Sequence, residues 1–252
     1  MDYTTDYDLF ADLYEQQYAH YRDDLDFYRR LAEDYGGPVL ELGAGGARVS
    51  RALAKVGVEV DAIEIAAKMI EKGKDALEED GLGAKVRYHQ ADMRAVRLEP
   101  SHHHPLVIAP FNALMHAYTL RDQNATLATV THHLKKGGRF ACDLYTPDFG
   151  PMGVLRHVTE WDGIGGDHST LFLLQHHDRA AQLVETRYYL DTVGENGALT
   201  RQTATLTQRY YTRFEFERLL YQAGFAQVQL YGDFGRERYH ADAPHMVFIA
   251  SR

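Results

Sequence analysis

The chain has 252 residues, of which 45% are hydrophobic and 25% are charged, and its formal net charge is −9. This length and composition indicate one α/β domain of a soluble globular protein, and the single cysteine, Cys142, excludes an internal disulfide. The negative charge argues against a nucleic-acid partner, because a binder of nucleic acid needs a basic face to displace counterions from phosphate. No apolar run reaches membrane-spanning length and residues 1–7 lack a signal-peptide pattern, so we expect no membrane association and a cytoplasmic location.

The N-terminal residues show helical periodicity. Residues 8–34 are predicted to form one or two helices, with Leu9, Phe10, Leu13 and Tyr14 on one face. We expect this segment to form a cap over the rest of the domain.

A strand, a glycine turn and a helix start follow at residues 39–50. Gly43 and Gly45 allow a tight turn and let a ligand approach the backbone, and the helix that follows directs free N–H groups toward the turn. A cofactor is therefore expected at the carboxyl end of this strand. Many nucleotide-binding folds share this pattern, so it does not identify the cofactor.

The next predicted strand, residues 58–64, ends on a carboxylate. Glu64 lies 21 residues after Gly43, which is close to the spacing expected for an acid that binds ribose hydroxyls. Up to this point NAD and S-adenosylmethionine fit equally well.

Strands and helices continue to alternate. A third strand ends at Asp92, a fourth lies near 105–110, a helix runs from about 122 to 134, and a fifth strand lies near 138–144. This alternation predicts a parallel sheet with helices on both faces, whose ligand contacts lie at the carboxyl edge.

Residues 151–210 break this rhythm. Three segments rich in Thr, Tyr, Val and Leu, at 171–177, 183–190 and 199–210, are separated by turn residues. They predict an inserted antiparallel β meander. Its role is left open between a lid over the site and a subunit contact.

Together these motifs resemble the class I S-adenosylmethionine-dependent methyltransferases. The matching segments are E-L-G-A-G-G at 41–46, Glu64, Q-A-D-M at 90–93 and L-K-K-G-G-R-F at 134–140, with a further match at 211–225. The resemblance implies a Rossmann-like, doubly wound, mostly parallel seven-stranded sheet with the inserted meander. The expected organisation is a single domain over 1–252, with an N-terminal cap at 1–35, a cofactor-binding core at 36–150, the insertion at 151–210 and a closing helix and hairpin at 211–252.

The resemblance also assigns the cofactor contacts of S-adenosyl-L-methionine, whose product is S-adenosyl-L-homocysteine. Glu64 would bind the ribose, Ile65 the adenine face, Asp92 the adenine amino group, and Met93 the adenine ring through its N–H. The methionine end would be bound by the remaining predicted residues, which are Tyr14, Glu41, Gly43, Ala44, Gly45, Arg48, Ala109 and Phe111.

Histidine is abundant, but one position stands out. His116 follows Phe111 on the loop that lines the acceptor side, and an imidazole there is the candidate catalytic group. The triplet at 102–104 lacks the converging geometry of a metal site, so no metal is expected.

Three functions remain open. The first is a methyltransferase for the N or O nucleophile of a small molecule, because A-P-F-N at 109–112 departs from the motif of DNA amino-methyltransferases. The others are an NAD-dependent oxidoreductase and a non-catalytic cofactor-binding protein. The sequence leaves the acceptor unspecified, and a monomer and a homodimer are both compatible with it.

Overall fold

The computed structural model describes residues 11, 14, 17–18, 21–147, 150–163 and 166–252. The predicted helical face at Leu9, Phe10 and Leu13 lies outside these residues. The first described element is helix α2, Leu25–Tyr35.

A seven-stranded sheet forms the centre of the molecule, in the order β10-β11-β5-β4-β1-β2-β3. Only β11 runs against its neighbours in this sheet, and the other pairs are parallel. The strands are β1 Val39–Leu42, β2 Val60–Glu64, β3 Val86–Gln90, β4 His104–Ala109, β5 Leu134–Tyr145, β10 Gln227–Tyr231 and β11 His245–Ser251.

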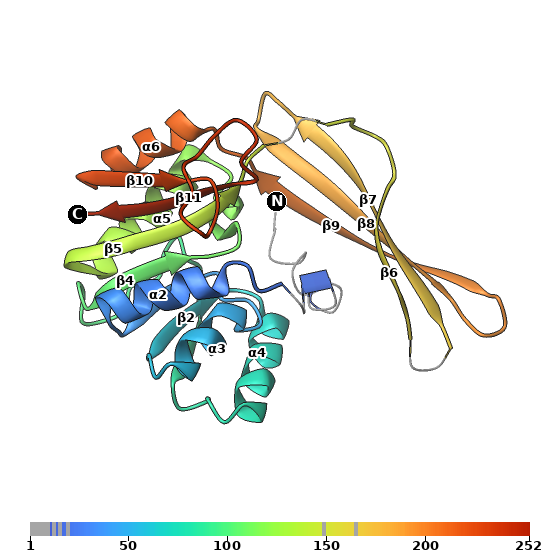
Figure 1. Ribbon diagram of the computed structural model, residues 1–252, viewed down its shortest axis with the longest axis horizontal. Helices are drawn as coiled ribbons and strands as arrows, with labels where there is room; N and C mark the ends of the chain where they lie inside the picture. Colours follow the sequence, from blue (N-terminus) through green and yellow to red (C-terminus); the bar gives the residue numbers. More distant parts are fainter. Residues whose placement is uncertain (1–10, 12–13, 15–16, 19–20, 148–149, 164–165) are drawn as a thin grey trace.

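Helices cover both faces of this sheet (Figure 1). Helices α2, α3 and α4 lie on one face, and α5 and α6 lie on the other. Their bounds are α3 Arg48–Lys55, α4 Ala67–Glu79, α5 Leu120–His133 and α6 Arg213–Gln222, and a short 3₁₀ helix η1 spans Ala113–His116.

The period-two pattern of the strands explains the two cores. In β4, Val107 faces the α5 and α6 side while Ile108 faces the α2 and α3 side. In β5, Cys142 is fully buried on the α5 and α6 side, and its neighbour Ala141 lies on the opposite side. Continuous apolar strands are typical of a sheet that is covered on both faces.

The chain order reverses between β1 and β4. The strands β1, β2 and β3 follow one another in one direction across the sheet, whereas β4 and β5 continue from β1 in the other direction. The connections therefore leave β1 and β4 on opposite sides, and a crevice opens above their carboxyl ends.

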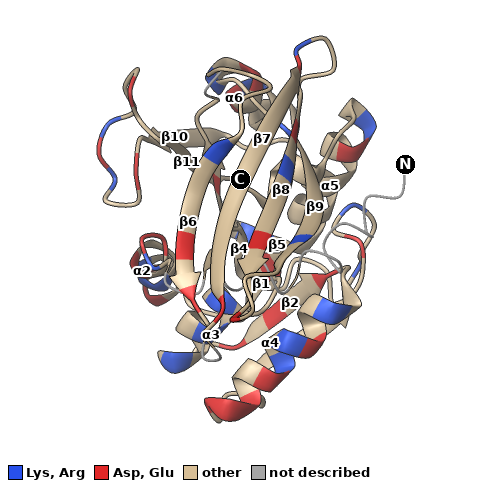
Figure 2. Cartoon of the chain, turned by 90° about the vertical axis from the view of Figure 1, so that its right-hand side faces the viewer, with Lys and Arg blue, Asp and Glu red and all other residues tan. Residues whose placement is uncertain are grey.

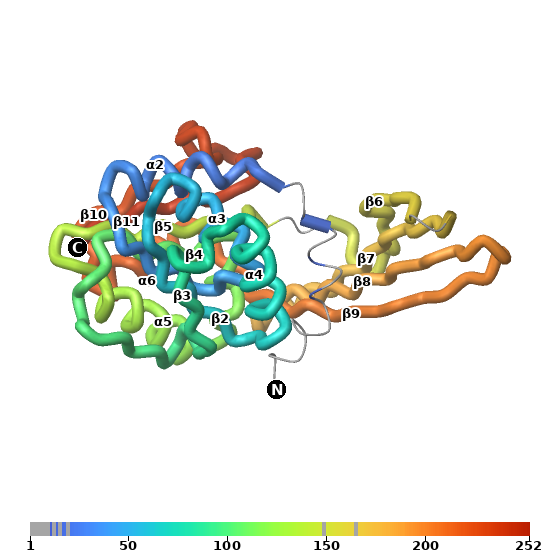
Figure 3. Tube along the Cα trace, turned by 90° about the horizontal axis from the view of Figure 1, so that it is seen from below, coloured from blue at the N-terminus to red at the C-terminus, as the bar shows by residue number. Residues whose placement is uncertain are grey.

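The insertion forms a second sheet, which projects from one side of the core (Figures 1 and 3). It has four antiparallel strands rather than the three expected: β6 Arg156–Asp162, β7 His168–Asp178, β8 Leu183–Val193 and β9 Leu199–Arg209. The additional strand, β6, is short and polar and carries a register shift between His157 and Thr159. These features of an edge strand weaken its sequence signal.

The inserted sheet is anchored to the core by a buried arginine at the end of β9. The Arg209 guanidinium pairs with Glu215 of α6 at 3.0 Å and donates to the side-chain oxygen of Gln182 at 2.8 Å. Its Nη1 also donates to the carbonyls of Ala181 and Tyr118. A single cation thus joins the β7–β8 turn, the start of α6 and the segment before α5.

The predicted fold class is confirmed: a mostly parallel seven-stranded sheet carries helices on both faces and an inserted antiparallel meander. Within the part of the chain that the structure describes, no helix is long and apolar enough to cross a membrane. Acidic and basic residues lie side by side along α4 (Figure 2), so this helix presents no face of a single charge.

A glycine in α4 sets the distance between α4 and the glycine turn. Gly73 is buried, and a Cβ atom there would lie 2.0 Å from Tyr88 Oη and 3.1 Å from the carbonyl carbon of Gly46. Because Tyr88 Oη donates to the Gly45 carbonyl at 2.7 Å, any side chain at position 73 would displace this hydrogen bond.

We therefore predict that Gly73→Ala lowers the free energy of unfolding by about 1–3 kcal/mol through overpacking. The matched control is Gly83→Ala, whose added Cβ meets nothing within 4 Å and whose effect should stay within about 1 kcal/mol. Urea denaturation followed by circular dichroism measures both. Equal midpoints for the two variants would contradict the role given to Gly73.

Candidate active site

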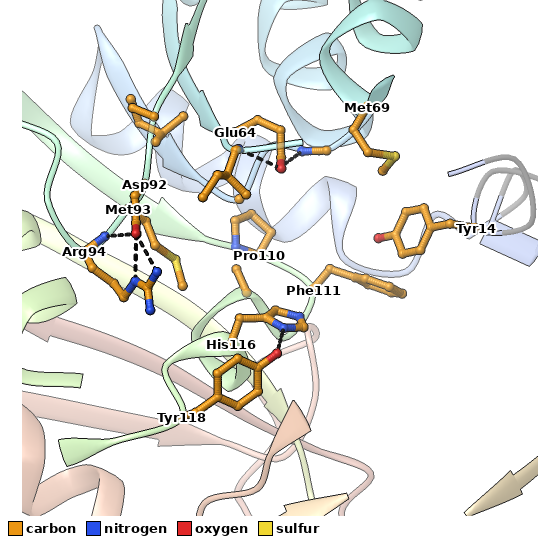
Figure 4. Close-up of a pocket in the computed structure, with 16 residues that line it drawn as sticks. Tyr14, Glu64, Met69, Asp92, Met93, Arg94, Pro110, Phe111, His116 and Tyr118 are labelled. Carbon is orange, nitrogen blue, oxygen red and sulfur yellow. Dashed lines mark hydrogen bonds and ion pairs between the residues drawn. The ribbon is translucent and has the colours of Figure 1, made fainter. Parts of the chain in front are cut away.

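A cavity lies above the carboxyl ends of β1, β2, β3 and β4, at the crevice between β1 and β4 (Figure 4). Glu64 and Asp92 lie toward one side of it in this view, and His116 and Tyr118 toward the other. Its lining residues are Tyr14, Gly43, Gly45, Ile63, Glu64, Ile65, Met69, Ala91, Asp92, Met93, Arg94, Pro110, Phe111, Ala113, His116 and Tyr118.

The glycine turn forms the floor of this cavity. Gly43 and Gly45 have positive φ angles of 72° and 53°, which disfavour a side chain. A Cβ on Gly43 would lie 2.9 Å from the Cβ of Ala113, and one on Gly45 would lie 3.1 Å from the Cε of Met69. The turn is thus a cradle that any larger residue would fill.

Glu64 forms hydrogen bonds to both the glycine turn and the start of α4. Its Oε2 accepts from the Gly45 N–H at 2.8 Å, and its Oε1 accepts from the N–H groups of Ile65 and Ala66 at 2.8 and 2.9 Å. The carboxylate therefore fixes the glycine turn and caps the start of α4, where negative charge is favoured.

Asp92 carries an ion pair that the sequence did not predict. Arg94 Nη2 lies 2.6 Å from Asp92 Oδ2, and the Arg94 N–H donates to Asp92 Oδ1 at 2.8 Å. Arg94 also reaches Asp122 in the first turn of α5 at 3.3 Å. This network holds the loop after β3 in place beside the cavity.

The loop after β4 is held by a buried carboxyl group of β5. Phe111 and Asn112 both have positive φ angles, 52° and 64°, which are unfavourable for residues other than glycine. The Oδ1 of Asp143 accepts from the Phe111 N–H at 2.8 Å and from Tyr28 Oη at 2.6 Å. Burial raises the pKa of Asp143 to about 6.

Aromatic rings close the cavity on the N-terminal side. The rings of Tyr14 and Tyr18 pack against Phe111, with centroids 5.9 and 4.7 Å from it. Burial raises the pKa of Tyr14, so its phenol is neutral at physiological pH. Of the predicted cap, residues 1–10, 12–13, 15–16 and 19–20 lie outside the described residues.

Arg48 is held close to this aromatic group by a fully buried acid. Its guanidinium pairs with both oxygens of Asp24 at 2.5 and 2.6 Å, and it lies 5.1 Å from the ring centroids of Tyr21 and Phe111. In this structure Arg48 therefore joins α2 to α3, and it borders a neighbouring groove rather than the cavity itself.

His116 lies at the acceptor side of the cavity. Its Nδ1 is 3.1 Å from Tyr118 Oη, and burial lowers the pKa of the imidazole to about 4. The ring is therefore neutral at physiological pH.

The predicted residues fall into two groups. Those that line the cavity are Tyr14, Gly43, Gly45, Glu64, Ile65, Asp92, Met93, Phe111 and His116, and those outside its lining are Glu41, Ala44, Arg48 and Ala109. Glu41 is buried beneath the turn, where its carboxylate accepts from Ser50 Oγ and burial raises its pKa to about 7.

Several lining residues were not among the predicted site residues. Among them, Arg94 has a charged side chain and Tyr118 has a hydroxyl group. Arg94 follows Asp92 by two residues, and this proximity of opposite charges was the signal available. Tyr118 became visible only through its contacts in the folded structure.

Comparisons with known proteins agree with the resemblance to methyltransferases. Residues 39–138 match the family described as a methyltransferase domain, and no curated protein matches the chain. The solved structure of the CcbJ methyltransferase from Streptomyces caelestis has a TM-score of 0.84 at 24% identity and covers 100% of this chain and 99% of that chain.

Two further solved structures are similar along most of their length. CalS10 from Micromonospora echinaspora, an amino pentose methyltransferase solved with S-adenosylmethionine bound, has a TM-score of 0.75 at 18% identity, with 95% of this chain and 96% of that chain covered. The sugar N-methyltransferase KedS8 from Streptoalloteichus has a TM-score of 0.75 at 16% identity, with 96% and 92% covered. At these identities the likeness establishes the fold.

Residues 39–138 thus match a methyltransferase-domain family, and the whole chain has the fold of solved methyltransferases. These matches agree with the predicted family, enzyme class and methyl donor. The lining fits a donor of this kind, because the glycine cradle leaves room for a ligand to approach the backbone and two acids, Glu64 and Asp92, line the same cavity. The alternatives of an NAD-dependent oxidoreductase and of a non-catalytic protein gain no support from the family match.

Glu64 generates a prediction about this methyltransferase. Glu64→Gln should raise the dissociation constant for S-adenosylhomocysteine at least about tenfold, because it removes the charge that binds the ribose hydroxyls. Isothermal titration calorimetry measures this change. The control is Glu59→Gln, an exposed acid just before the same strand, which should leave the constant unchanged. An unaltered constant for Glu64→Gln would remove Glu64 from the ribose site.

Asp143 generates a prediction about pH. Its folded-state pKa of about 6 lies above its ordinary value, so its contribution to stability is present below about pH 4 and is lost as the pH rises through 6. Asp143→Asn keeps an Oδ1 acceptor but cannot ionise. Relative to the wild type, this variant should gain up to about 3 kcal/mol between pH 4 and pH 7.

Chemical denaturation at pH 4, 5, 6 and 7 measures the difference between the two proteins. Other titrating groups are common to both and cancel. Parallel stability curves would show that folding leaves the pKa of Asp143 at its ordinary value.

Proposed function

We propose that this protein transfers a methyl group to the amine nitrogen of a small polar molecule, such as an amino sugar. S-adenosylmethionine, when bound, supplies a methyl group on a positively charged sulfur, which is activated without help from the protein. What the protein contributes is alignment of the nucleophile and exclusion of water.

A second cavity beside the first is the argument for a small-molecule acceptor. It lies between the core and the inserted sheet and shares Tyr14 and Phe111 with the cofactor cavity, so the two spaces meet at these rings. Its walls include Gln175 of β7, Thr186 of β8 and Gln208 of β9. Amide and hydroxyl groups of this kind bind the polar groups of a hydroxylated ligand without requiring it to carry a charge.

We infer a nitrogen rather than an oxygen acceptor because the histidine that lines the cavity is a weak base. The imidazole of His116 has a pKa of about 4, whereas a phenol has a pKa of about 10 and sugar hydroxyls are weaker acids still. Proton transfer from a phenol to His116 would therefore cost about 8 kcal/mol. A neutral amine attacks without losing a proton, so it needs no base.

The two carboxylates that line the cofactor cavity already have hydrogen-bond or ion-pair partners. Glu64 accepts three backbone N–H groups, and Asp92 is paired with Arg94. The similar structures include an amino pentose methyltransferase and a sugar N-methyltransferase, which agrees with an amine acceptor.

The proposal keeps three sequence predictions that remain to be tested. These are a cytoplasmic location, the lack of a nucleic-acid partner, and a single domain whose residues 151–210 act as an acceptor wall or a dimer contact. The polar lining from β7, β8 and β9 favours the acceptor wall.

A matched acceptor screen tests the choice of nitrogen. Pairs of amino sugars and their hydroxyl counterparts are incubated with the protein and isotopically labelled S-adenosylmethionine, and methylated products are identified by mass spectrometry. We expect transfer to amines and none to the paired alcohols. Transfer to an alcohol but not to its amine partner would overturn the proposal.

A further inference from the structure

The second cavity has one permanent charge among its described lining residues. That charge belongs to Arg156, the first residue of β6, and the described lining includes no Asp, Glu or Lys. The side chain of Arg156 is exposed, so its guanidinium lies at the mouth of the cavity. The cavity therefore presents a positive charge to a molecule that enters it.

Arg156 differs from the other arginines of the inserted sheet. Three further arginines lie in its strands, and each pairs with an acid: Arg187 with Glu185 at 2.8 Å, Arg201 with Asp191 at 2.5 Å, and Arg209 with Glu215 at 3.0 Å. Among the residues that the structure describes, Arg156 has no ion-pair partner, and its one hydrogen bond goes to a neutral group, the side-chain oxygen of Gln175. Its charge is therefore not compensated by these residues.

Gln175 holds the guanidinium in place without neutralising it. The Gln175 Oε1 accepts from Arg156 Nη2, and the Gln175 Nε2 donates to Thr186 Oγ1 at 3.2 Å. The three side chains form a row across β6, β7 and β8, and all three line the cavity. A guanidinium has five N–H donors, so a single bond to Gln175 leaves donors for a ligand.

A carboxylate is the ligand group that fits this site. The planar fork of a guanidinium matches the two oxygens of a carboxylate, and charge-assisted pairs of this kind are the stronger hydrogen bonds of proteins. A phosphate monoester also accepts from arginine, but it carries a charge of about −1.5 to −2 at pH 7, which one cation balances only in part. A single permanent cation favours a single negative charge.

The same distribution of charge bears on the amine. An ammonium group in this cavity would find no carboxylate in the described lining and would be repelled by Arg156. An α-amino group has a pKa of about 8, so a neutral fraction exists in water at physiological pH. The cavity thus favours the neutral amine, which is the form that attacks a methyl group.

We propose that Arg156, held by Gln175, binds a carboxylate of the methyl acceptor, so that the acceptor is a small molecule with an acidic group as well as an amine. This inference rests on the proposed function, because it places the acceptor in the second cavity. Arg156 acts in binding only, and it gives up no proton during transfer.

Nuclear magnetic resonance tests the binding site without any transfer. Protein labelled with ¹⁵N-arginine and bound to S-adenosylhomocysteine is titrated with acetate, or with its neutral counterpart acetamide, at constant ionic strength. Arg156→Gln assigns the Nε signal of Arg156, and Arg187→Gln assigns that of Arg187, which lies outside the cavity lining. Acetate should bind at Arg156 at least about fivefold more tightly than at Arg187, and acetamide should shift neither signal.

Equal responses of the two arginines to acetate, or no response of Arg156, would exclude a carboxylate site. An equal response of Arg156 to acetamide would exclude it as well, because the site would then not recognise charge. Circular dichroism confirms that each variant is folded.

Kinetics with amines from the acceptor screen tests the role in the reaction. Each amine is prepared with a carboxylate, with a carboxamide and with a phosphate ester at the same position. The wild type should favour the carboxylate at least about fivefold in kcat/KM over either counterpart. Arg156→Gln should raise KM for the carboxylate about tenfold and change kcat less than about twofold, because it removes a binding contact that is remote from the reacting atoms.

Two further variants sharpen this test. Arg156→Lys keeps the charge but loses the fork, so its KM for the carboxylate should lie between those of the wild type and Arg156→Gln. The matched control, Arg187→Gln, should show the kinetics of the wild type. All these variants should bind S-adenosylhomocysteine as the wild type does.

The outcomes separate this inference from the proposed function. Transfer to amines with a preference for the carboxamide or the phosphate ester, or with KM unchanged in Arg156→Gln, would overturn the role of Arg156 and leave the proposed function standing. If no amine is methylated in any form, the proposed function fails, and the acetate titration alone decides whether Arg156 forms a carboxylate site.

Discussion

The reversal of strand order between β1 and β4 is the constraint on which this structure depends. Two parallel strands lie side by side, but the chain leaves them toward opposite sides of the sheet, so no connection crosses above their carboxyl ends. The glycine turn at Gly43 and the strained pair Phe111 and Asn112 both occupy this point. Each needs an unusual backbone conformation, and each is held by a carboxylate from a neighbouring strand.

Buried acids are the means by which these turns keep their shape. Glu64 of β2 accepts the Gly45 N–H, and Asp143 of β5 accepts the Phe111 N–H. Removing a carboxylate from water is costly, and its hydrogen bonds offset that cost only in a defined geometry. The raised pKa of Asp143 shows that the compensation there is incomplete. In this structure both Glu64 and Asp143 therefore hold backbone at the two turns.

The inserted sheet lines the second cavity and also contacts a residue of the first. In β9, Gln208 contributes to the wall of the second cavity, while the carbonyl of its neighbour Thr207 accepts from Tyr118. The strand lies at the edge of its sheet, so carbonyls on its outer side have no partner strand. Tyr118 donates to one of them and thereby joins the inserted sheet to the lining of the first cavity.

Local sequence was sufficient for the fold and for much of the cofactor side. The strand endings at Glu64 and Asp92, the glycines at 43 and 45, and the alternation of strands and helices are properties of short segments, and the structure brings them to one edge. The edge strand β6 escaped detection because its residues are polar and its register is interrupted.

The long-range contacts of Arg48 and Tyr118 were decided by tertiary structure alone. Arg48 pairs with Asp24, which lies 24 residues away, and Tyr118 meets Thr207 across 89 residues. Such pairs depend on how helices and sheets pack, and no local periodicity encodes them. The sequence by itself therefore predicted a parallel sheet with a ligand cavity at its carboxyl edge. Only the tertiary structure decided which groups line the second cavity, because several of them come from an inserted sheet whose position is fixed by long-range contacts.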